Sequence, residues 1–413
     1  MKAYADFTLD GTIDTINVAP GIYMEDVIIR TPLALVGAGR GQSIINAMSL
    51  SNGIYIDGLD NPGLSKVVVT GFTIENANFE GILVTNASFV TIWLNEVVNN
   101  DRSLNPSVPS CNGIPGFETN ESFDCGEGIH LIGVDHSTVV NNISEKNSGG
   151  ILLSDETSAT HHNLIIGNLV RDNSFDCGIT LASHSPAPPP YSTLTSPPGI
   201  YSNTIANNES SRNGLQVPGA GAGVGLFAPG PGNKVYANVV ISNELKDNGL
   251  PGVAMHNHAS FPPPSPPVNL NDNVIVGNRI FGNGADTDDA VTPGPTGINV
   301  FGVCPITGTI ITGNVIDDES VDIVTNTPAQ VNVNLNDLLD GNIGVDNIGA
   351  GTVDATENWW GCPGGPGKRE CTTVSGPGVI FTPWLRHPIP KVNCPGDDEK
   401  ENQRDDRRNE AER

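Results

Sequence analysis

The chain is poor in charged and aromatic side chains. Only 16% of its 413 residues are Asp, Glu, Lys or Arg, and 5% are Phe, Trp or Tyr, whereas globular chains average roughly 25% charged residues. No window carries a sustained apolar stripe at the spacing i, i+3, i+4, i+7, so helix is a minor component at most. Gly (48) and Pro (32) are abundant, which favours short strands joined by many turns.

Basic side chains are especially scarce. Twenty Lys and Arg stand against 46 Asp and Glu, for a net charge of −26. A body this acidic repels nucleic acid and anionic membrane surfaces, and no stretch approaches the ~18 apolar residues of a membrane span. We expect no nucleic-acid partner and no membrane insertion. The N-terminal segment also lacks a signal-peptide core, so the leader of an exported protein is expected to lie outside this sequence.

Seven cysteines are present, and four of them form two pairs that are close in sequence: Cys111 with Cys125, and Cys362 with Cys371. These spacings fit loop-closing disulfides in an oxidising compartment, so a secreted or periplasmic location is expected. The remaining three are unassigned: Cys177, Cys304 and Cys394. An odd count leaves at least one free thiol.

Two segments recur along the chain. One is rich in asparagine and aligns into a column of Asn142, Asn168, Asn208, Asn243, Asn278 and Asn314, with a second column of Asn147, Asn173, Asn213, Asn248 and Asn283. The other has apolar residues two apart after a glycine, at Gly53, Gly81, Gly128, Gly150, Gly178, Gly223, Gly252 and Gly297. This is the period of a half-buried strand. Asparagines at one repeat position can stack and hydrogen-bond to the next coil.

Such repeats predict a β-solenoid. The chain resembles right-handed parallel β-helix proteins, a superfamily that groups pectate lyases with periplasmic copper-associated proteins. The residues that carry the resemblance are the opening segment 15–47, the two repeats, and the closing segment ATENWWGCPGGPG at 355–367. The resemblance spans roughly residues 1–390. It implies an all-β, single-stranded right-handed parallel β-helix with long Pro-rich loops on one side, and it leaves the activity open.

One domain is expected over residues 1–394, with Trp359, Trp360 and Gly361 in a cap that closes the last coil. The charged segment 395–413 is expected to be a disordered tail. A monomer is expected. Three Pro-rich excursions follow the glycine-led strands and would stand as walls on one side of the helix: residues 185–199, 228–233 and 259–267.

Histidines and acids align when each strand is numbered from its glycine. Position 7 holds Glu156, His184 and His258, position 6 holds Asp155, and position 5 holds His256. Neighbouring coils lie ~4.8 Å apart, so Glu156 and His184 should be adjacent, with His258 two coils further on. The other four histidines of this region are interpreted as residues that stabilise corners between strands: His130, His136, His161 and His162.

The aligned residues allow two kinds of chemistry. The candidate catalytic residues are Glu156, His184, His258 and Asp155, because an imidazole oriented by a carboxylate can act as a general base. The candidate metal ligands are His184, His256 and His258, which would bind a divalent ion such as calcium, copper or zinc. An acidic run at 284–290 with Asp317, Asp318 and Glu319 is the calcium alternative, although a solvated loop is favoured there. No organic cofactor is expected.

The first functional hypothesis is an exported protein that binds and modifies a polysaccharide by histidine-based lyase or epimerase-like chemistry, with or without the assistance of a metal. No Lys or Arg occupies positions 5 to 7 of any aligned strand, which argues against a pectate-lyase mechanism with a basic side chain as the base. The alternatives are a copper-binding accessory protein and a non-catalytic structural surface protein. All three stay open at the level of the sequence.

Overall fold

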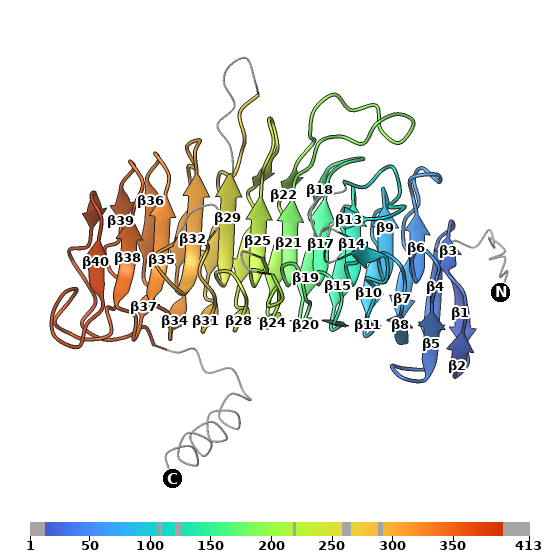
Figure 1. Cartoon of the computed structure of the whole chain (residues 1–413), viewed down its shortest axis with the longest axis horizontal. Helices are drawn as coiled ribbons and strands as arrows, with labels where there is room; N and C mark the ends of the chain where they lie inside the picture. Colours follow the sequence, from blue (N-terminus) through green and yellow to red (C-terminus); the bar gives the residue numbers. More distant parts are fainter. Residues whose placement is uncertain are drawn as a thin grey trace, which may run out of the picture.

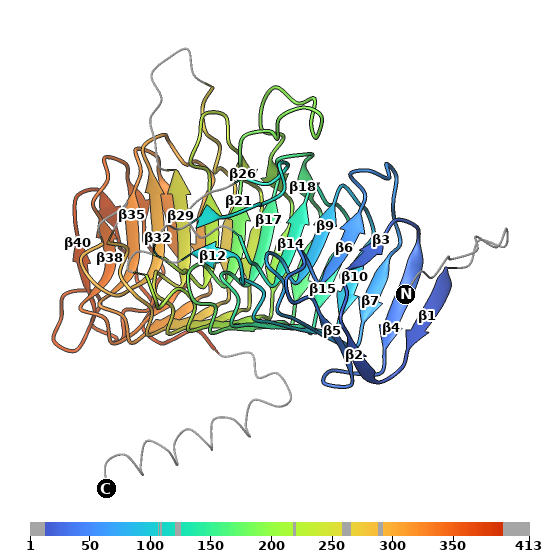
Figure 2. The same ribbon diagram turned by 45° about the vertical axis from the view of Figure 1, so that its right-hand side comes forward.

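The computed structural model describes residues 13–105, 107, 110–119, 125–217, 220–257, 266–287 and 292–390. These residues form a right-handed parallel β-helix in which each coil adds a strand to each of three long sheets (Figure 1). Every strand pair within the three sheets is parallel, and the coils stack from the N-terminal end of the chain to its C-terminal end (Figure 2). The predicted fold is confirmed.

The strand bounds follow sheet by sheet. Sheet A contains β1 (Asp14–Val18), β4 (Leu33–Gly37), β7 (Val68–Thr70), β10 (Thr91–Trp93), β15 (Thr138–Val140), β19 (Leu164–Ile166), β23 (Thr204–Ala206), β27 (Val239–Ile241), β30 (Val274–Val276), β33 (Ile310–Thr312), β36 (Val331–Asn334), β39 (Val353–Asp354) and β41 (Val379–Ile380). Sheet B contains β2 (Gly21–Tyr23), β5 (Ser43–Asn46), β8 (Phe72–Glu75), β11 (Glu96–Val98), β16 (Ile143–Glu145), β20 (Leu169–Arg171), β24 (Glu209–Ser211), β28 (Glu244–Lys246), β31 (Arg279–Phe281), β34 (Val315–Asp317) and β37 (Asp337–Leu338). Sheet C contains β3 (Val27–Ile29), β6 (Ile54–Asp57), β9 (Ile82–Thr85), β14 (Ile129–Ile132), β17 (Ile151–Ser154), β21 (Ile179–Ala182), β25 (Val224–Phe227), β29 (Val253–Asn257), β32 (Thr296–Gly302), β35 (Val321–Asn326), β38 (Ile343–Asn347) and β40 (Thr373–Ser375). Two small sheets complete the set: β18 (Thr160–His161), β22 (Ile200–Tyr201) and β26 (Val235–Tyr236) are parallel, and β12 (Leu104–Asn105) and β13 (Ser110–Cys111) are antiparallel.

The core is a set of apolar columns that run along the helix axis. Alternation within each strand sends every second side chain inward, and the parallel register places like residues above one another. One such column in sheet C consists of Ile82, Ile129, Ile151, Ile179, Val224, Val253 and Ile298, all buried. The glycine before these strands is required by packing, because a Cβ on Gly178 would collide with Oγ of Ser210 on the next coil.

Buried asparagine ladders hold the corners together, as the sequence predicts. In the first ladder each Nδ2 donates to Oδ1 of the asparagine on the next coil at 2.9–3.2 Å. It runs through Asn95, Asn142, Asn168, Asn208, Asn243, Asn278, Asn314, Asn336 and Asn358. The second ladder runs from Asn100 through Asn147, Asn173, Asn213, Asn248 and Asn283, and ends on the carboxylate of Glu319. The sequence reasoning missed a third ladder, through Asn163, Asn203, Asn238 and Asn273.

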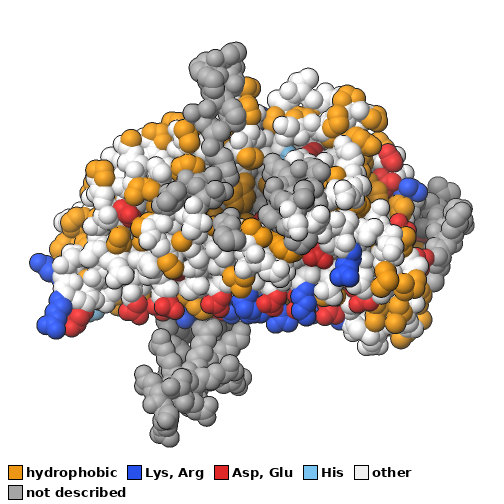
Figure 3. Space-filling view, in the orientation of Figure 1, with side chains coloured by type: hydrophobic (Ala, Val, Ile, Leu, Met, Phe, Trp, Pro, Cys, Tyr) orange, Lys and Arg blue, Asp and Glu red, His pale blue; other side chains and the backbone are white. Residues whose placement is uncertain are grey.

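Charged side chains gather in a row over sheet B, along the lower edge of the space-filling view (Figure 3). They form ion pairs between neighbouring coils: Arg171 with Glu145 at 2.7 Å, Arg212 with Asp172 at 2.7 Å, and Lys246 with Glu209 at 2.8 Å. The few basic side chains therefore offset part of the acidic charge on one face. Such exposed pairs contribute only about 0–1 kcal/mol each.

Both expected disulfides form, Cys111 with Cys125 and Cys362 with Cys371. Cys177 and Cys304 are free, and Cys394 lies outside the described residues. Trp360 is fully buried in the apolar core of the last coils. No helix within the described ranges is long and apolar enough to cross a membrane.

Long loops cover the outward face of sheet C. The segment that leads into β14 places Phe117 against Leu83 and Ile132, which point away from the core. The Pro-rich loop after β21 adds Ala187 to this second apolar cluster, and it extends from the top of the stack in Figure 1. The loops therefore bury side chains on a face that would otherwise be open to solvent.

Candidate functional site

The structure brings Glu156 and His184 together on neighbouring coils. Nδ1 of His184 lies 2.8 Å from Oε1 of Glu156, and both side chains are buried. Burial by itself would raise the pKa of Glu156, but the charge and hydrogen bond of His184, with a smaller contribution from His130, lower it to about 2. The carboxylate is thus ionised at neutral pH.

Asp155 accepts three hydrogen bonds at the base of the Pro-rich loop. Its Oδ1 accepts a hydrogen bond from the backbone N–H of His184 at 2.7 Å, and its Oδ2 accepts from Gly199 N–H at 2.8 Å and from Ser183 Oγ at 3.0 Å. Burial raises its pKa to about 7, against these hydrogen bonds. Asp155 joins the two ends of the Pro-rich loop, and its catalytic role stays a prediction.

His256 belongs to a second, separate cluster. Nε2 of His256 lies 2.8 Å from Oδ2 of Asp286 and 3.0 Å from Nδ2 of Asn299, and all three residues are buried. In the register of sheet C, Phe227 stands between Ala182 and His256 and packs its ring edge-on to the imidazole. His258 lies outside the described residues. The predicted ligand set of His184, His256 and His258 therefore stays a prediction.

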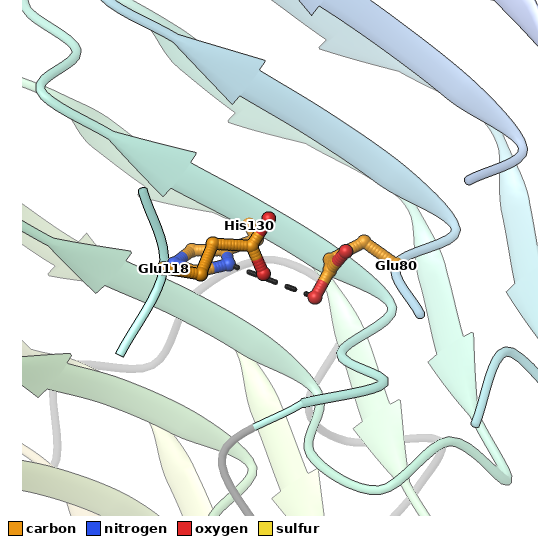
Figure 4. Close-up of side chains that lie close together, drawn as sticks. All are labelled: Glu80, Glu118 and His130. Carbon is orange, nitrogen blue, oxygen red and sulfur yellow. Dashed lines mark ion pairs between the residues drawn. The ribbon is translucent and has the colours of Figure 1, made fainter. Parts of the chain in front are cut away.

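Glu80, Glu118 and His130 form a cluster that the sequence reasoning missed (Figure 4). Glu80 precedes β9, His130 points outward from β14, and Glu118 lies in the loop that covers them. Their potential ligand atoms all lie within 4.8 Å of one another, and Nδ1 of His130 is 3.9 Å from Oε1 of Glu80. The corner interpretation of His130 was wrong, because this residue lies in the middle of a strand. The side chain of His130 lies between Glu80 and Glu118 on one side and Ser154 of the neighbouring strand β17 on the other.

Negative charge converges on this cluster. Burial raises the pKa of Glu118 well above its ordinary value, and the nearby carboxylates of Glu80, Glu156 and Glu127 raise it further. Glu118 shares a side-chain hydrogen bond with Glu80, but no N–H or alcohol group of the described residues donates to the buried carboxylate of Glu80, and Nδ1 of His130 is also buried without a hydrogen bond. Buried polar atoms are rarely left in this state unless a further group binds them. The cluster has the charge and the open donor atoms of a cation site.

The donor set is two carboxylates and one imidazole. Nε2 of His130 lies 2.9 Å from Oγ of Ser154, and a hydrogen bond from Nε2–H to this hydroxyl leaves the lone pair on Nδ1 for a metal. Imidazole suits zinc, copper(II), iron and nickel, whereas carboxylates also accept manganese and calcium. The absence of thiolate and thioether from these three residues makes them a poor match for copper(I).

A sequence signal for part of this cluster exists. The tripeptide Glu-Gly-Ile occurs at residues 80–82 and again at 127–129, so two glutamates occupy the same repeat position just before strands that pair in sheet C. That equivalence puts both acids at one edge of the sheet. Glu118 has no such signal, because it comes from an irregular loop.

The model of a family described as periplasmic copper-binding protein (NosD) matches residues 14–251, which is more than half of the chain. No curated protein sequence matches the chain. The solved structures that resemble it include the Dettilon tailspike protein gp208, with a TM-score of 0.58 and 13% identity over 89% of this chain and 62% of that chain.

Two further structures are similar at the level of the fold. The DFA-IIIase from Arthrobacter chlorophenolicus A6 without its lid has a TM-score of 0.55 and 12% identity over 90% of this chain and 89% of that chain. The catalytic domain of a GH87 alpha-1,3-glucanase has a TM-score of 0.53 and 13% identity over 89% and 64%. The chain thus spans less than two thirds of the tailspike and of the glucanase domain. At these identities the likeness extends to the parallel β-helix fold alone.

Proposed function

We propose that this chain, which belongs to the family of periplasmic copper-binding proteins (NosD), binds a divalent transition-metal ion outside the cytoplasm through Glu80, Glu118 and His130. The observation that carries the proposal is the meeting of these three side chains, with all potential ligand atoms within 4.8 Å of one another beneath a covering loop. The two disulfides support an oxidising compartment.

Electrostatics supports a cation at this place. Carboxylates that share a buried site repel one another, so one of them must be protonated or a cation must offset the charge. Glu80, Glu118, Glu127 and Glu156 interact in this way, and the raised pKa of Glu118 reflects their repulsion and its burial. A divalent ion between Glu80 and Glu118 would remove the repulsion and lower the pKa of Glu118. Metal binding would then favour release of the Glu118 proton.

Each residue has a defined part in the proposed site. The carboxylates of Glu80 and Glu118 and Nδ1 of His130 would be the ligands, while Ser154 holds the other nitrogen of the imidazole. Glu156 would act indirectly, since its Oε1 accepts a hydrogen bond from the backbone N–H of Thr119 at 3.3 Å. This contact holds the loop residue that follows Glu118. The bound ion would supply positive charge and Lewis acidity.

Metal content and binding test the proposal directly. We expect the chelator-treated protein to take up one equivalent of zinc(II) or copper(II) at this site, measured by calorimetry and by elemental analysis after desalting. Glu80→Gln combined with Glu118→Gln should remove that equivalent, because both charged ligands are lost. Glu357→Gln is the matched control, since this exposed glutamate lies near the C-terminal end of the helix.

Thermal melting gives an independent measure. A ligand that binds only the folded state adds about 2.7 kcal/mol of stability at a hundredfold excess over its Kd, so metal should raise the melting temperature of the wild type and of Glu357→Gln. The double variant should show a smaller rise, because the contribution of this site is lost. Equal metal uptake by the wild type and the double variant, or no uptake by either protein, would contradict the proposal.

The same carboxylates support a second candidate, the modification of a polysaccharide. Two neighbouring carboxyl groups with pKa values pushed apart are the pattern of paired acid–base catalysis. Here the pKa of Glu118 is raised and that of Glu156 is lowered to about 2, and His184 orients Glu156. A panel of uronate-rich and neutral glycans, with and without divalent metal, should then yield a product that Glu118→Gln fails to form. No product with any glycan would dispose of this candidate and leave metal binding unaffected.

A further inference from the structure

A second group of histidines lies on the surface, at the corner between sheets C and A. Two successive coils contribute Asp135 and His136, then His161 and His162, at equivalent positions. The coils are fixed to each other by backbone hydrogen bonds from His136 N–H to His161 O at 3.2 Å and from His161 N–H to Val134 O at 3.1 Å. His136 and His162 are exposed, and His161 is partly buried. We call these four residues the corner cluster.

The imidazoles of the corner cluster face one another at short range. Nδ1 of His161 lies 2.9 Å from Nδ1 of His162, and the ring of His136 is parallel to that of His162 with centroids 5.0 Å apart. Nδ1 of His136 pairs with Oδ1 of Asp135 at 2.7 Å, and Oδ2 of Asp135 accepts a hydrogen bond from Ser88 Oγ at 2.7 Å. Three imidazoles and one carboxylate thus lie side by side at this corner, apart from the buried cluster.

The backbone does not require histidine at this corner. His136 and His162 have positive φ angles of 49° and 55°, and the same corner on other coils holds Ser202 at 55° and Ala237 at 53°. Small side chains therefore satisfy the turn as well as imidazole does. The rings are instead held in place by stacking, since Tyr201 packs on His161 with centroids 4.9 Å apart and Phe89 packs on His136 at 5.3 Å.

The separation of the two nitrogens matches a particular metal geometry. Metal–imidazole bonds of ~2.0–2.1 Å place two ligands at right angles about 2.9 Å apart, and right-angled nitrogen and oxygen ligands characterise copper(II) and nickel(II).

We propose that His161 and His162 are the two nitrogen ligands of an exposed copper(II) site, with the His136–Asp135 pair of the preceding coil supplying a third donor and its orienting carboxylate. This site is separate from the buried cluster of Glu80, Glu118 and His130, and it does not depend on the function proposed for that cluster. Its exposure suits the uptake and release of an ion from solution.

Electron paramagnetic resonance of the full chain with added copper(II) tests the proposal. The wild type should show a tetragonal copper(II) signal with hyperfine splitting from at least two imidazole nitrogens. His161→Gln combined with His162→Asn should lose that signal and one equivalent of bound copper, because both nitrogen ligands are removed. Asparagine is chosen at 162 because it tolerates positive φ. Asp135→Asn should weaken copper binding about 10- to 100-fold, as expected when the group that orients a ligand is lost.

The controls separate this site from the buried one. His387→Ala removes an exposed histidine elsewhere and should leave signal and stoichiometry unchanged, while Glu80→Gln with Glu118→Gln should keep the corner signal. Circular dichroism shows whether the corner double variant folds. If it does not, the single variant His162→Asn tests the proposal instead, since it should reduce the number of nitrogens coupled to copper by one. Wild-type signal and copper content in either corner variant would overturn the proposal.

Discussion

Nδ1 of His184 lies 2.8 Å from Oε1 of Glu156, and the same oxygen accepts a hydrogen bond from the backbone of Thr119. The ion pair therefore links two coils of the helix to the loop that carries Glu118. Because both partners are buried, loss of one of them leaves an uncompensated charge or donor in a low-dielectric surrounding.

Replacement of Glu156 should destabilise the fold at neutral pH. Breaking a buried pair costs about 3–5 kcal/mol, so Glu156→Gln should unfold at lower urea than the wild type at pH 7. The folded-state pKa of about 2 lies below the ordinary 4.5, so the stability that the carboxylate contributes is present above pH 4.5 and is lost as the pH falls toward 2. The difference between the two proteins should shrink over that range. Asp172→Asn, in an exposed pair with Arg212, should change stability by less than about 1 kcal/mol at any of these pH values.

Glu319, at the end of the second asparagine ladder, should give stability the opposite pH dependence. Burial raises the pKa of Glu319 to about 8, although it accepts hydrogen bonds from Asn283 N–H and Nδ2. A raised pKa contributes stability below pH 4.5 that is lost as the pH rises through 8. Glu319→Gln keeps an acceptor for both donors and has no charge to bury, so it should exceed the wild type by up to roughly 4 kcal/mol at pH 9 and match it at pH 4. Urea unfolding at the two pH values measures this, and an equal difference at both would contradict it.

Replacing an asparagine at the centre of the first ladder should destabilise the fold. Nδ2 of Asn208 donates to Ile165 O at 2.9 Å and to Asn243 Oδ1 at 3.0 Å, while its Oδ1 accepts from Asn168 N–H at 2.9 Å. Asn208→Ala leaves these buried groups unpaired at about 1–3 kcal/mol each, so we expect a loss of about 3 kcal/mol or more in thermal or urea unfolding. Asn207→Gly is the control, because the neighbouring residue is exposed with a φ of 52°. A loss below 1 kcal/mol at Asn208 would mean that the ladder adds little.

The Cys111–Cys125 disulfide should govern metal affinity rather than the fold of the coils. It closes the loop that contains Glu118, across 14 residues of sequence, and a constraint on a loop of this length is worth about 3 kcal/mol. Cys111→Ser with Cys125→Ser should therefore weaken metal binding by up to about a hundredfold, measured by calorimetry. Removing Cys362–Cys371 in the same way should leave affinity unchanged. Equal effects of the two pairs would point to a general loss of stability instead.

Because the sequence repeats, both the β-helix architecture and the adjacency of Glu156 and His184 could be predicted from it. Asn142 and Asn168 recur at one position because each coil presents the same corner, and the glycine-led strands alternate with period two because each has one face in the core. These are local patterns that every coil repeats. They predict which residues share a column, and the neighbours within a column follow from the ~4.8 Å spacing of the coils.

The site could not be predicted in the same way, because it depends on where irregular segments fold back. Asn95 and Asn142 are neighbours in the ladder although they are 47 residues apart in sequence, and the extra chain between them forms the loop that carries Glu118. His130 lies on the outward face of its strand, which is buried only because that loop and the Pro-rich loop cover it. Local periodicity sets strand, corner and column, since those depend on backbone geometry and coil spacing. The loop contacts that bring Glu118 to Glu80 and His130 depend on packing between distant segments, for which the repeat holds no pattern.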